Sequence, residues 1–533
     1  GQTTHGGGTG LGGVTFRDVV VDGLADPMGG EPPDEPAGRG QGHEAGDASL
    51  ARFAESNVEA VAGTGLRIVA AAPETTGTAQ GELLGYGLAG LLLLAGIGVV
   101  VLQKRALPTV DGEVVGGAVD ETTLAEIASA PKPESGAEPA AAPKAARAAP
   151  AGVALERSIF RAYDVRGVVG KTLDAGIARL LGQAVGTLMQ EQGLREIVVG
   201  RDGRHSGPQL SEGLIQGLRD AGRNVIDIGQ AATPLVYFAG FHFRTGTGVA
   251  ITGSHNPPDY NGFKIVVGGE TLSGKAIEGL YARIVEGRLH QADAPGEVRQ
   301  AEVSDDYVQR IAGDIQLERP MRVVVDCGNG VPGLVAPAVL EAIGAEVIPL
   351  FCEVDGDFPN HHPDPSDPRN LVDLINMVQR MDAEIGIALD GDGDRLGVVT
   401  RSGEVIYPDR LLMLLAEDVL NRNPGACVLY DVKCTGHLAG HILRHGGSPV
   451  MWMTGHSLIK AKMKETEAEL AGEMSGHFFF RERWYGFDDG IYAAARLLEI
   501  LAADPRTPEE AFASLPKGVS TPELKVDMAE GEG

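Results

Sequence analysis

The segment from Ile385 to Thr400 reads IGIALDGDGDRLGVVT, and its pattern predicts two strands joined by an acidic loop. The runs 385–389 and 396–400 are short and apolar, as buried strands are. Glycines separate three aspartates in the loop, so their carboxylates can converge on one hard cation through oxygen ligands. These residues are Asp390, Asp392 and Asp394. The segment therefore predicts a metal-binding loop where a strand of a sheet ends.

Two other interpretations of this loop need weighing. An EF-hand loop begins similarly, but it needs glycine at its sixth position and glutamate at its twelfth, where this chain has Arg395 and Arg401. The predicted strands also stand where an EF-hand has helices. The remaining alternative is a solvated acidic turn.

Outward from this loop, short apolar runs alternate with longer amphipathic stretches from Arg157 onward. Glu196–Gly200 and Val225–Ile228 have the composition of strands. Asp174–Gln192 and Gln209–Ala221 have the periodicity of helices. This repeated order predicts α/β domains with largely parallel sheets.

A second loop of interest follows the apolar run Gly248–Ile251 and reads TGSHNP, with Ser254 at its third position. Ligands gather where strands of an α/β sheet end. A serine beside a histidine also occurs in acyl transfer, but there is no GxSxG elbow here, and adjacent residues seldom adopt base-to-nucleophile geometry. An ordinary turn is the alternative.

A third loop, Gly472–His477, reads GEMSGH and places a carboxylate, a hydroxyl and an imidazole close together in the chain. Glu473, Ser475 and His477 supply these groups, which suit the vicinal hydroxyls of a sugar.

In this order, TGSHNPPDYNGFK, DGDGDR and GEMSGH resemble the active-serine, metal and sugar-recognition loops of the α-D-phosphohexomutases, of the bacterial phosphomannomutase/phosphoglucomutase type. The resemblance extends from Ser158 to about residue 530. Further matching segments are YDVRG at 163–167, VGRDGRHSG at 199–207, FPNHHPDP at 358–365, DVKCTG at 431–436 and TGHSLIK at 454–460.

The resemblance implies an isomerase that interconverts hexose 1-phosphates and hexose 6-phosphates through a hexose 1,6-bisphosphate intermediate. Ser254 would carry a phosphoryl group, and together with Asp390, Asp392 and Asp394 it would bind Mg²⁺. The cation is needed because three carboxylates and a group of charge about −1.5 to −2 could not otherwise share the site.

The resemblance also assigns the remaining site residues. Arg166, Lys264 and Arg395 would surround Ser254 and stabilise the moving phosphoryl group, with Lys264 and His477 as candidates for proton transfer. The residues expected to bind substrate are Tyr163, His255, Lys433, His456, Glu473, Ser475 and His477. For each cation, the alternative is a surface or core-edge charge.

Met474 favours mannose and glucose phosphates as substrates, because phosphoglucosamine mutases usually have glutamine at this position. A phosphoglucosamine mutase is therefore one alternative function. The other is a membrane-tethered module that binds sugar phosphates without catalysis.

Residues 83–102, LLGYGLAGLLLLAGIGVVVL, predict a single transmembrane helix, since about 20 uncharged residues can cross a hydrocarbon core of roughly 30 Å. The following Lys104 and Arg105 favour a cytoplasmic location for the catalytic domains and an inner-membrane localisation. Residues 1–82 have a low-complexity composition and are expected to be a flexible extracytoplasmic segment. Residues 103–156 are expected to be an Ala/Pro-rich linker.

The enzyme region is expected to contain three consecutive α/β mixed-sheet domains around a central cleft, at residues 157–304, 305–403 and 404–517. Residues 518–533 look like the start of a truncated fourth domain, which in family members carries an Arg-Ser-Asn-Thr-type loop that clamps phosphate. Without that loop, turnover is expected to be lower by orders of magnitude. The sequence leaves the oligomeric state open, with a monomer as the simplest case.

Composition limits the partners. The net charge of −28 argues against nucleic acid, which is bound by clustered Lys and Arg. It does not exclude an anionic small molecule, and the resemblance implies phosphosugars as the partners. The four cysteines form no CxxC pair, which excludes a disulfide framework and a zinc ribbon.

Two further motifs resemble binding sites but are more simply explained as loops. Gly328–Gly333 fits GxGxxG, but Pro332 stiffens the turn, so an ordinary loop is favoured over a nucleotide site. His361 and His362 lie near Asp364 and Asp367, and the intervening prolines favour an ordered loop over a metal site.

Overall fold

The computed structural model describes residues 19–22, 58–60, 67–70 and 154–518. The chain divides into two compact units, residues 1–141 and 142–533. The first unit contains an antiparallel sheet of three short strands in the order β1-β3-β2. They are β1 (Val19–Asp22), β2 (Val58–Ala60) and β3 (Arg67–Ala70). Strands of three or four residues are too short to show a period in sequence, so they were not predicted.

The second unit begins with a mixed sheet of seven strands, in the order β10-β6-β5-β7-β8-β4 with β9 paired to β8. Its strands are β4 (Val165–Val168), β5 (Glu196–Arg201), β6 (Asn224–Gln230), β7 (Gly248–Ile251), β8 (Tyr260–Val267), β9 (Glu270–Thr271) and β10 (Val298–Gln300). Its helices are η4 (Arg157–Ile159), α2 (Ala175–Glu191), α3 (Gly207–Asp220), α4 (Thr233–His242) and α5 (Lys275–Val285).

Helices α2 and α3 pack very closely against each other. Asp174 caps α2 by accepting a hydrogen bond from the Ile177 amide at 2.8 Å. A Cβ atom at Gly217 of α3 would lie 1.9 Å from the Arg179 carbonyl oxygen of α2. Glycine is therefore required for the two backbones to approach this closely.

The second sheet has five strands in the order β12-β11-β13-β14-β15. All five residues of β13 are buried, as are all five of β14, which explains their continuous apolar sequence. The strands are β11 (Arg322–Asp326), β12 (Glu346–Leu350), β13 (Ile385–Leu389), β14 (Leu396–Thr400) and β15 (Val405–Ile406). The helices are α6 (Ser304–Ala312), η5 (Val331–Leu334), α7 (Ala336–Ala342), η6 (Pro368–Leu371) and α8 (Val372–Arg380).

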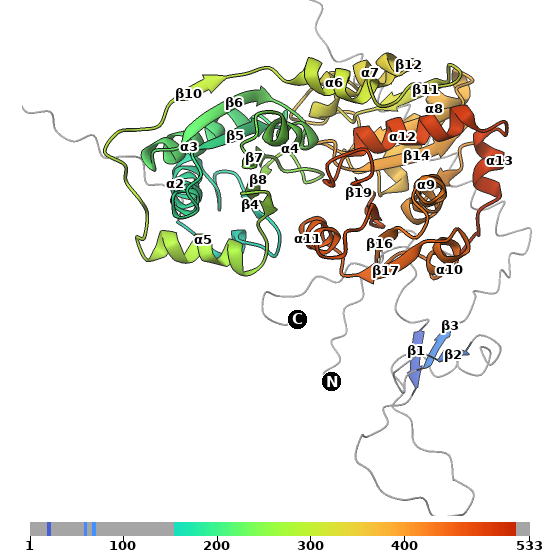
Figure 1. Ribbon diagram of the computed structural model, residues 1–533, viewed down its shortest axis with the longest axis horizontal. Coiled ribbons are helices and arrows are strands. Elements are labelled where there is room, and N and C mark those ends of the chain that lie inside the picture. The colour runs from blue at the N-terminus through green and yellow to red at the C-terminus, as the bar shows by residue number, and fades with distance from the viewer. Residues whose placement is uncertain (1–18, 23–57, 61–66, 71–153, 519–533) are drawn as a thin grey trace, which may run out of the picture. The chain divides into compact units, whose positions relative to one another are not determined.

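The third sheet has four strands in the order β17-β16-β18-β19. They are β16 (Cys427–Asp431), β17 (Ser448–Trp452), β18 (Leu470–Gly472) and β19 (Phe478–Phe480). The helices are α9 (Pro408–Arg422), α10 (His437–Arg444), α11 (His456–Thr466), α12 (Gly490–Ala503) and α13 (Pro508–Ala513). Figure 1 shows the three sheets and their helices following one another along the chain from green to red.

One apolar core joins all three α/β domains. Phe238 of α4 stacks on Trp484 at 6.3 Å between ring centroids and meets Tyr307 of α6 edge-on at 5.4 Å. The same cluster of buried residues continues through β11, β13, α9 and α12. Helix α4 is buried along eight of its residues because it lies between the first sheet and this shared core.

The predicted α/β domains are thus present, but the prediction of a membrane-spanning helix is corrected. Residues 83–102 lie outside the described residues, and among those described no helix is long and apolar enough to cross a membrane. The longest of them, α2, has 17 residues, whereas a span needs about 20. Three further predictions depended on that helix and are corrected together with it. They are the membrane partner, the inner-membrane localisation and the cytoplasmic position of the catalytic domains.

Other predicted segments also fall outside the described residues. These are most of the segment 1–82, the linker up to residue 153 and residues 519–533 of the expected fourth domain.

Candidate functional site

Strand β7 delivers Ser254 to a tight loop at the end of the first sheet. Its backbone is left-handed, with φ 48°, and its amide donates a hydrogen bond to Thr252 Oγ1 at 2.7 Å. The buried Ser254 hydroxyl donates to Asp390 Oδ2 at 2.8 Å. The predicted serine loop and acidic loop therefore contact each other, although 136 positions separate the two residues.

Arg204 was not among the predicted site residues, and it holds the backbone of the serine loop. Its guanidinium is buried and donates to the carbonyl oxygens of Ser254 at 2.7 Å and Asn256 at 2.6 Å. It also donates to Tyr260 O at 3.0 Å, and to Asp202 Oδ2 at 3.0 Å. A single side chain thus fixes the backbone on which Ser254 stands. The only sequence signal was the RDGR segment at 201–204.

The three aspartates of the acidic loop are buried and lie close enough together to hold one ion. Lys264 Nζ, from β8, donates to Asp392 Oδ2 at 2.7 Å and contacts Asp394 Oδ2. Thr233 Oγ1, at the start of α4, donates to the same Asp392 oxygen at 2.6 Å. The other carboxylate oxygen of Asp392, Oδ1, is buried and accepts no hydrogen bond from the described residues. A buried carboxylate oxygen without a partner fits a cation ligand.

The charges in this loop are strongly perturbed. Burial, then repulsion from Asp392 and Asp394, raises the pKa of Asp390 well above its ordinary value. Burial also raises the pKa of Asp394, but Lys264 and His477 outweigh it and hold that pKa well below its ordinary value. Three clustered carboxylates therefore need positive charge nearby to remain ionised together.

Arg395 and His477 bring the third domain to this loop. Arg395 pairs with His477 in an isolated β-bridge, and its Nε lies 4.0 Å from Asp390 Oδ2. His477 Nε2 lies 3.3 Å from Asp394 Oδ1. Burial lowers the pKa of His477, but the Asp394 carboxylate more than offsets this, and the pKa is raised to about 9. His477 is therefore charged at neutral pH, and its Nε2 faces the Asp394 carboxylate as an ion pair.

The other ring nitrogen of His477, Nδ1, contacts residues of the loop that carries His477. Nδ1 lies 2.8 Å from Ser475 Oγ and 3.0 Å from Glu473 Oε2. Glu473 is buried, and its Oε1 accepts from the Gly455 amide at 2.5 Å. The three predicted sugar-binding groups are thus held together by direct contacts.

His456, at the start of α11, faces the same cluster. Its ring lies 5.8 Å from the His477 ring and 5.5 Å from that of Tyr163, which is partly exposed. Neither ring nitrogen of His456 has a hydrogen-bond partner among the described residues. Burial, then the charges of Lys460 and Lys264, lowers the pKa of His456 well below its ordinary value. This neutral imidazole can therefore bind a ligand.

Arg166 and His255 both contact residues of the serine loop. Arg166 is buried on β4 and contacts Asp164 and the side chain of Asn256 in the serine loop. His255 Nδ1 lies 3.2 Å from Ser254 Oγ. The Arg395 charge, and then burial, lowers the pKa of His255 well below its ordinary value. Both residues can therefore contact a group carried on the serine.

Lys433 lies on the exposed loop that follows β16. Two residues earlier, buried Asp431 ties this loop to its neighbours. Its Oδ2 accepts from Thr454 Oγ1 at 2.8 Å, and its Oδ1 accepts from the Met474 amide at 3.3 Å. Asp431 was not predicted, because a structural carboxylate inside DVKCTG has no distinguishing pattern.

The Gly328–Gly333 loop and His361 both have structural contacts. The Gly328–Gly333 loop packs against the acidic loop, where a Cβ atom at Gly330 would lie 2.8 Å from the Gly391 carbonyl oxygen. His361 Nε2 lies 3.0 Å from Asp326 Oδ2, which gives it a structural partner.

Three protein-family models match the region that contains this site. Residues 157–290, 305–403 and 407–518 match the models for phosphoglucomutase/phosphomannomutase alpha/beta/alpha domains I, II and III.

Individual relatives are similar over the same region. A phosphomannomutase/phosphoglucomutase of Pseudomonas putida is 57% identical over 377 residues, which cover 71% of this chain and 81% of the relative. A phosphoglucomutase of Neisseria meningitidis is 55% identical over 377 residues, covering 71% and 82%. The crystal structure of a phosphoglucomutase/phosphomannomutase family protein from Burkholderia thailandensis is 55% identical, with a TM-score of 0.67, and the match covers 69% of this chain and 82% of that one.

Proposed function

This chain belongs to the phosphoglucomutase/phosphomannomutase family and is a hexose phosphate mutase, an isomerase, and we propose that Ser254 is its phosphoryl carrier. The observation that carries the proposal is the 2.8 Å hydrogen bond from the Ser254 hydroxyl to Asp390 of the acidic loop. A phosphoryl group on that oxygen would stand against the cluster of carboxylates and cations. Since phosphate monoesters hydrolyse extremely slowly unaided, such a group can persist until a sugar hydroxyl displaces it.

Asp390, Asp392 and Asp394 would hold Mg²⁺ together with the phosphate on Ser254. Buried oxygen ligands, including the unpartnered Oδ1 of Asp392, suit this hard cation. The ion supplies positive charge that lets three carboxylates and a phosphate share one site. Lys264, which contacts Asp392 and Asp394, would then be available to the transferring phosphoryl group.

Arg166, Lys264 and Arg395 would stabilise the charge that develops on the phosphoryl group. All three approach the serine and acidic loops from different strands or loops, so they are positioned before substrate arrives. Fixed cations of this kind lower the barrier to phosphoryl transfer because they need no reorganisation during the reaction.

Glu473 and Ser475 would bind sugar hydroxyls, while His456, Lys433, Tyr163 and His255 would recognise the phosphosugar. His477 or Lys264 would exchange a proton with the attacking hydroxyl. The attacking hydroxyl gives up a proton and the departing Ser254 oxygen takes one up, and these two side chains would carry the proton between them. Transfer to the 6-hydroxyl of a hexose 1-phosphate gives a 1,6-bisphosphate, which must turn around before its 1-phosphate returns to Ser254.

Mannose and glucose phosphates are the proposed substrates, on the strength of the names of the relatives. Met474 does not strengthen this choice, because its side chain packs against the apolar core.

Mass spectrometry and steady-state kinetics on the full chain test the proposal. After treatment with glucose 1,6-bisphosphate and Mg²⁺, Ser254 should carry a phosphoryl group, and S254A should lose turnover by orders of magnitude. D392N should weaken Mg²⁺ activation, which is measured as the Mg²⁺ concentration for half-maximal rate. An unmodified Ser254 with no turnover would indicate a non-catalytic binding module instead. A strong preference for glucosamine 1-phosphate would overturn the proposed substrates.

A further inference from the structure

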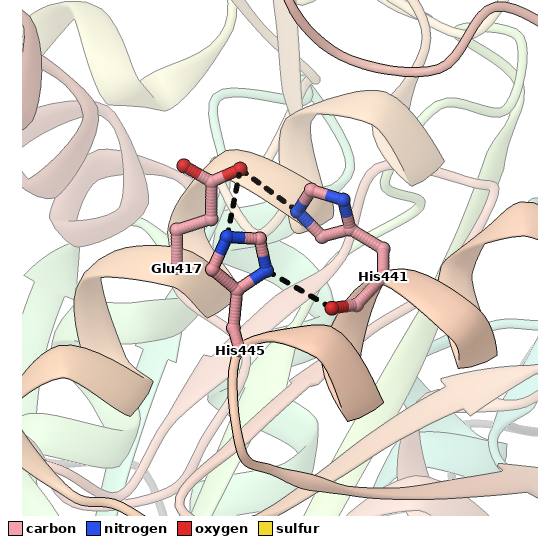
Figure 2. A group of neighbouring side chains, drawn as sticks. All are labelled: Glu417, His441 and His445. Carbon is pink, nitrogen blue, oxygen red and sulfur yellow. Dashed lines mark hydrogen bonds and ion pairs between the residues drawn. The ribbon is translucent and has the colours of Figure 1, made fainter.

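Away from this site, helices α9 and α10 bring together two histidines and a carboxylate. Figure 2 shows both imidazoles directed at one oxygen of Glu417. His441 Nε2 lies 2.9 Å from Glu417 Oε1, and His445 Nε2 lies 3.8 Å from the same atom. One ligand atom from each residue lies within 4.8 Å of the others.

The contact between His441 and Glu417 is short but is not a hydrogen bond. His441 is 4% exposed, and its Nε2 has no hydrogen-bond partner among the described residues. A buried ring nitrogen without a partner is costly unless something else satisfies it. His441 Nε2 and Glu417 Oε1 lie close together without hydrogen-bond geometry. Two atoms that bind the same metal ion would be placed in this way.

His445 is oriented in the way that metal-bound histidines usually are. Its Nδ1 lies 2.9 Å from the His441 carbonyl oxygen. Because a carbonyl can only accept, Nδ1 must donate, and the neutral ring then keeps a lone pair on Nε2. That lone pair faces the Glu417 carboxylate. Backbone carbonyls fix the tautomer of metal-bound histidines in the same way.

We propose that Glu417, His441 and His445 form a binding site for a divalent transition metal ion of the zinc class. Zinc bonds to nitrogen and oxygen of about 2.0–2.1 Å at tetrahedral angles place two ligand atoms about 3.3 Å apart. The separations of 2.9 and 3.8 Å lie on either side of this value. Two imidazoles and one carboxylate suit zinc, whereas Mg²⁺ prefers oxygen ligands.

The ion would have access from solvent. The side chains of His445 and Glu417 are 34% and 28% exposed, so the site opens on the surface while His441 forms its buried wall. Three protein ligands and one open position are the arrangement of many zinc sites.

The ion would tie α10 to α9. Helix α10 begins one residue after the loop 431–436 that carries Lys433. The other end of α9 already holds this loop, because Asp409 Oδ2 accepts from the Thr435 amide at 2.9 Å. A metal ion at Glu417 would add a direct connection between α9 and α10 and so stabilise the third domain.

Cobalt and zinc binding to the metal-stripped full chain, in excess Mg²⁺ to occupy oxygen-rich sites, tests this proposal. The wild type should bind one equivalent of Zn²⁺ by calorimetry, and Co²⁺ at this site should give the visible spectrum of a four-coordinate ion. E417Q and H445Q should each lower the affinity by at least about 100-fold, since loss of an outer-shell partner alone costs about 10–100-fold.

H437Q is the matched control, because His437 is exposed on the same helix and does not belong to the cluster. It should bind Zn²⁺ like the wild type, and H445Q should keep the wild-type melting temperature in the absence of metal. No Zn²⁺ binding by the wild type, or equal binding by E417Q and H445Q, would overturn the proposal. The cluster would then be a pair of histidine–carboxylate ion contacts.

Discussion

Arg204 positions Ser254 through its backbone. Its planar guanidinium reaches several carbonyl oxygens at once, including those of Ser254 and Asn256. Lysine carries the same charge, but it is a single ammonium without this fixed fork. The serine loop therefore depends on the shape of this side chain as well as on its charge.

We expect R204K to lower kcat/KM by about 100-fold, because a displacement of about 1 Å in a reacting group can cost this much. Phosphorylated Ser254 should still be detectable by mass spectrometry, since the Ser254 hydroxyl itself is unchanged. A value within twofold of the wild type would show that the loop holds its conformation without Arg204.

The sequence singled out residues whose proposed roles use their own side chains, and it did not single out residues that hold other groups in place. Ser254, the three aspartates and His477 lie in short loops whose residue types match their chemistry, and the structure brings them into contact. Arg204 and Asp431 act on backbone groups far away in the chain. Such partners depend on the fold and leave no local pattern.

At the scale of the element, the α2–α3 contact depends on glycine. G217A should lower the free energy of unfolding by about 1–3 kcal/mol, because the added methyl group would meet the Arg179 carbonyl at 1.9 Å. Chemical denaturation measures this change.

The matched control for this substitution is G279A in α5, where an added Cβ would meet nothing within 4 Å. It should stabilise the protein by about 0.4–1 kcal/mol, because alanine restricts the unfolded chain. Similar effects of the two substitutions would contradict close packing of α2 on α3.

The cap of α12 should make stability depend on pH. Asp489 caps this helix and is buried beside Tyr307 and Trp484. Burial raises its pKa from 3.8 to about 7, against the lowering effect of its hydrogen bonds. The folded protein therefore binds this proton more tightly, and the cost of burying the carboxylate grows as pH rises from about 4 to 7.

D489N removes this cost and keeps a residue that can cap the helix. Relative to the wild type, the variant should gain roughly 2–4 kcal/mol of stability between pH 5 and pH 8. Thermal unfolding of both proteins at the two pH values measures the difference. An unchanged difference would mean that Asp489 titrates near its ordinary pKa.

Element boundaries were predicted well where the chain contains a long periodic pattern. The predicted helix 174–192 corresponds to α2 with its two cap residues, and the predicted strand 196–200 to β5. The short strands β1, β2 and β3 were not predicted, because three or four residues carry no usable period. Their pairing depends on contacts between distant parts of the chain.

At the scale of the whole molecule, the shared core should make the three α/β domains unfold together. Calorimetry of the full chain should show one main transition, whose van't Hoff enthalpy agrees with the calorimetric enthalpy. Three resolved transitions would show that the domains are energetically independent. F238A should broaden or split the transition, since it removes a ring that contacts both Trp484 and Tyr307.

Helix α4 also affects how such a protein can change in evolution. Its residues belong to the first domain by sequence, yet Phe238 packs on aromatic rings contributed by the second and third. A gene exchange that replaced one domain alone would introduce core side chains that do not fit those of the two remaining domains. Recombination between relatives should therefore succeed when all three domains come from the same parent. Loops at the protein surface should diverge in sequence more freely than the residues that pack around α4.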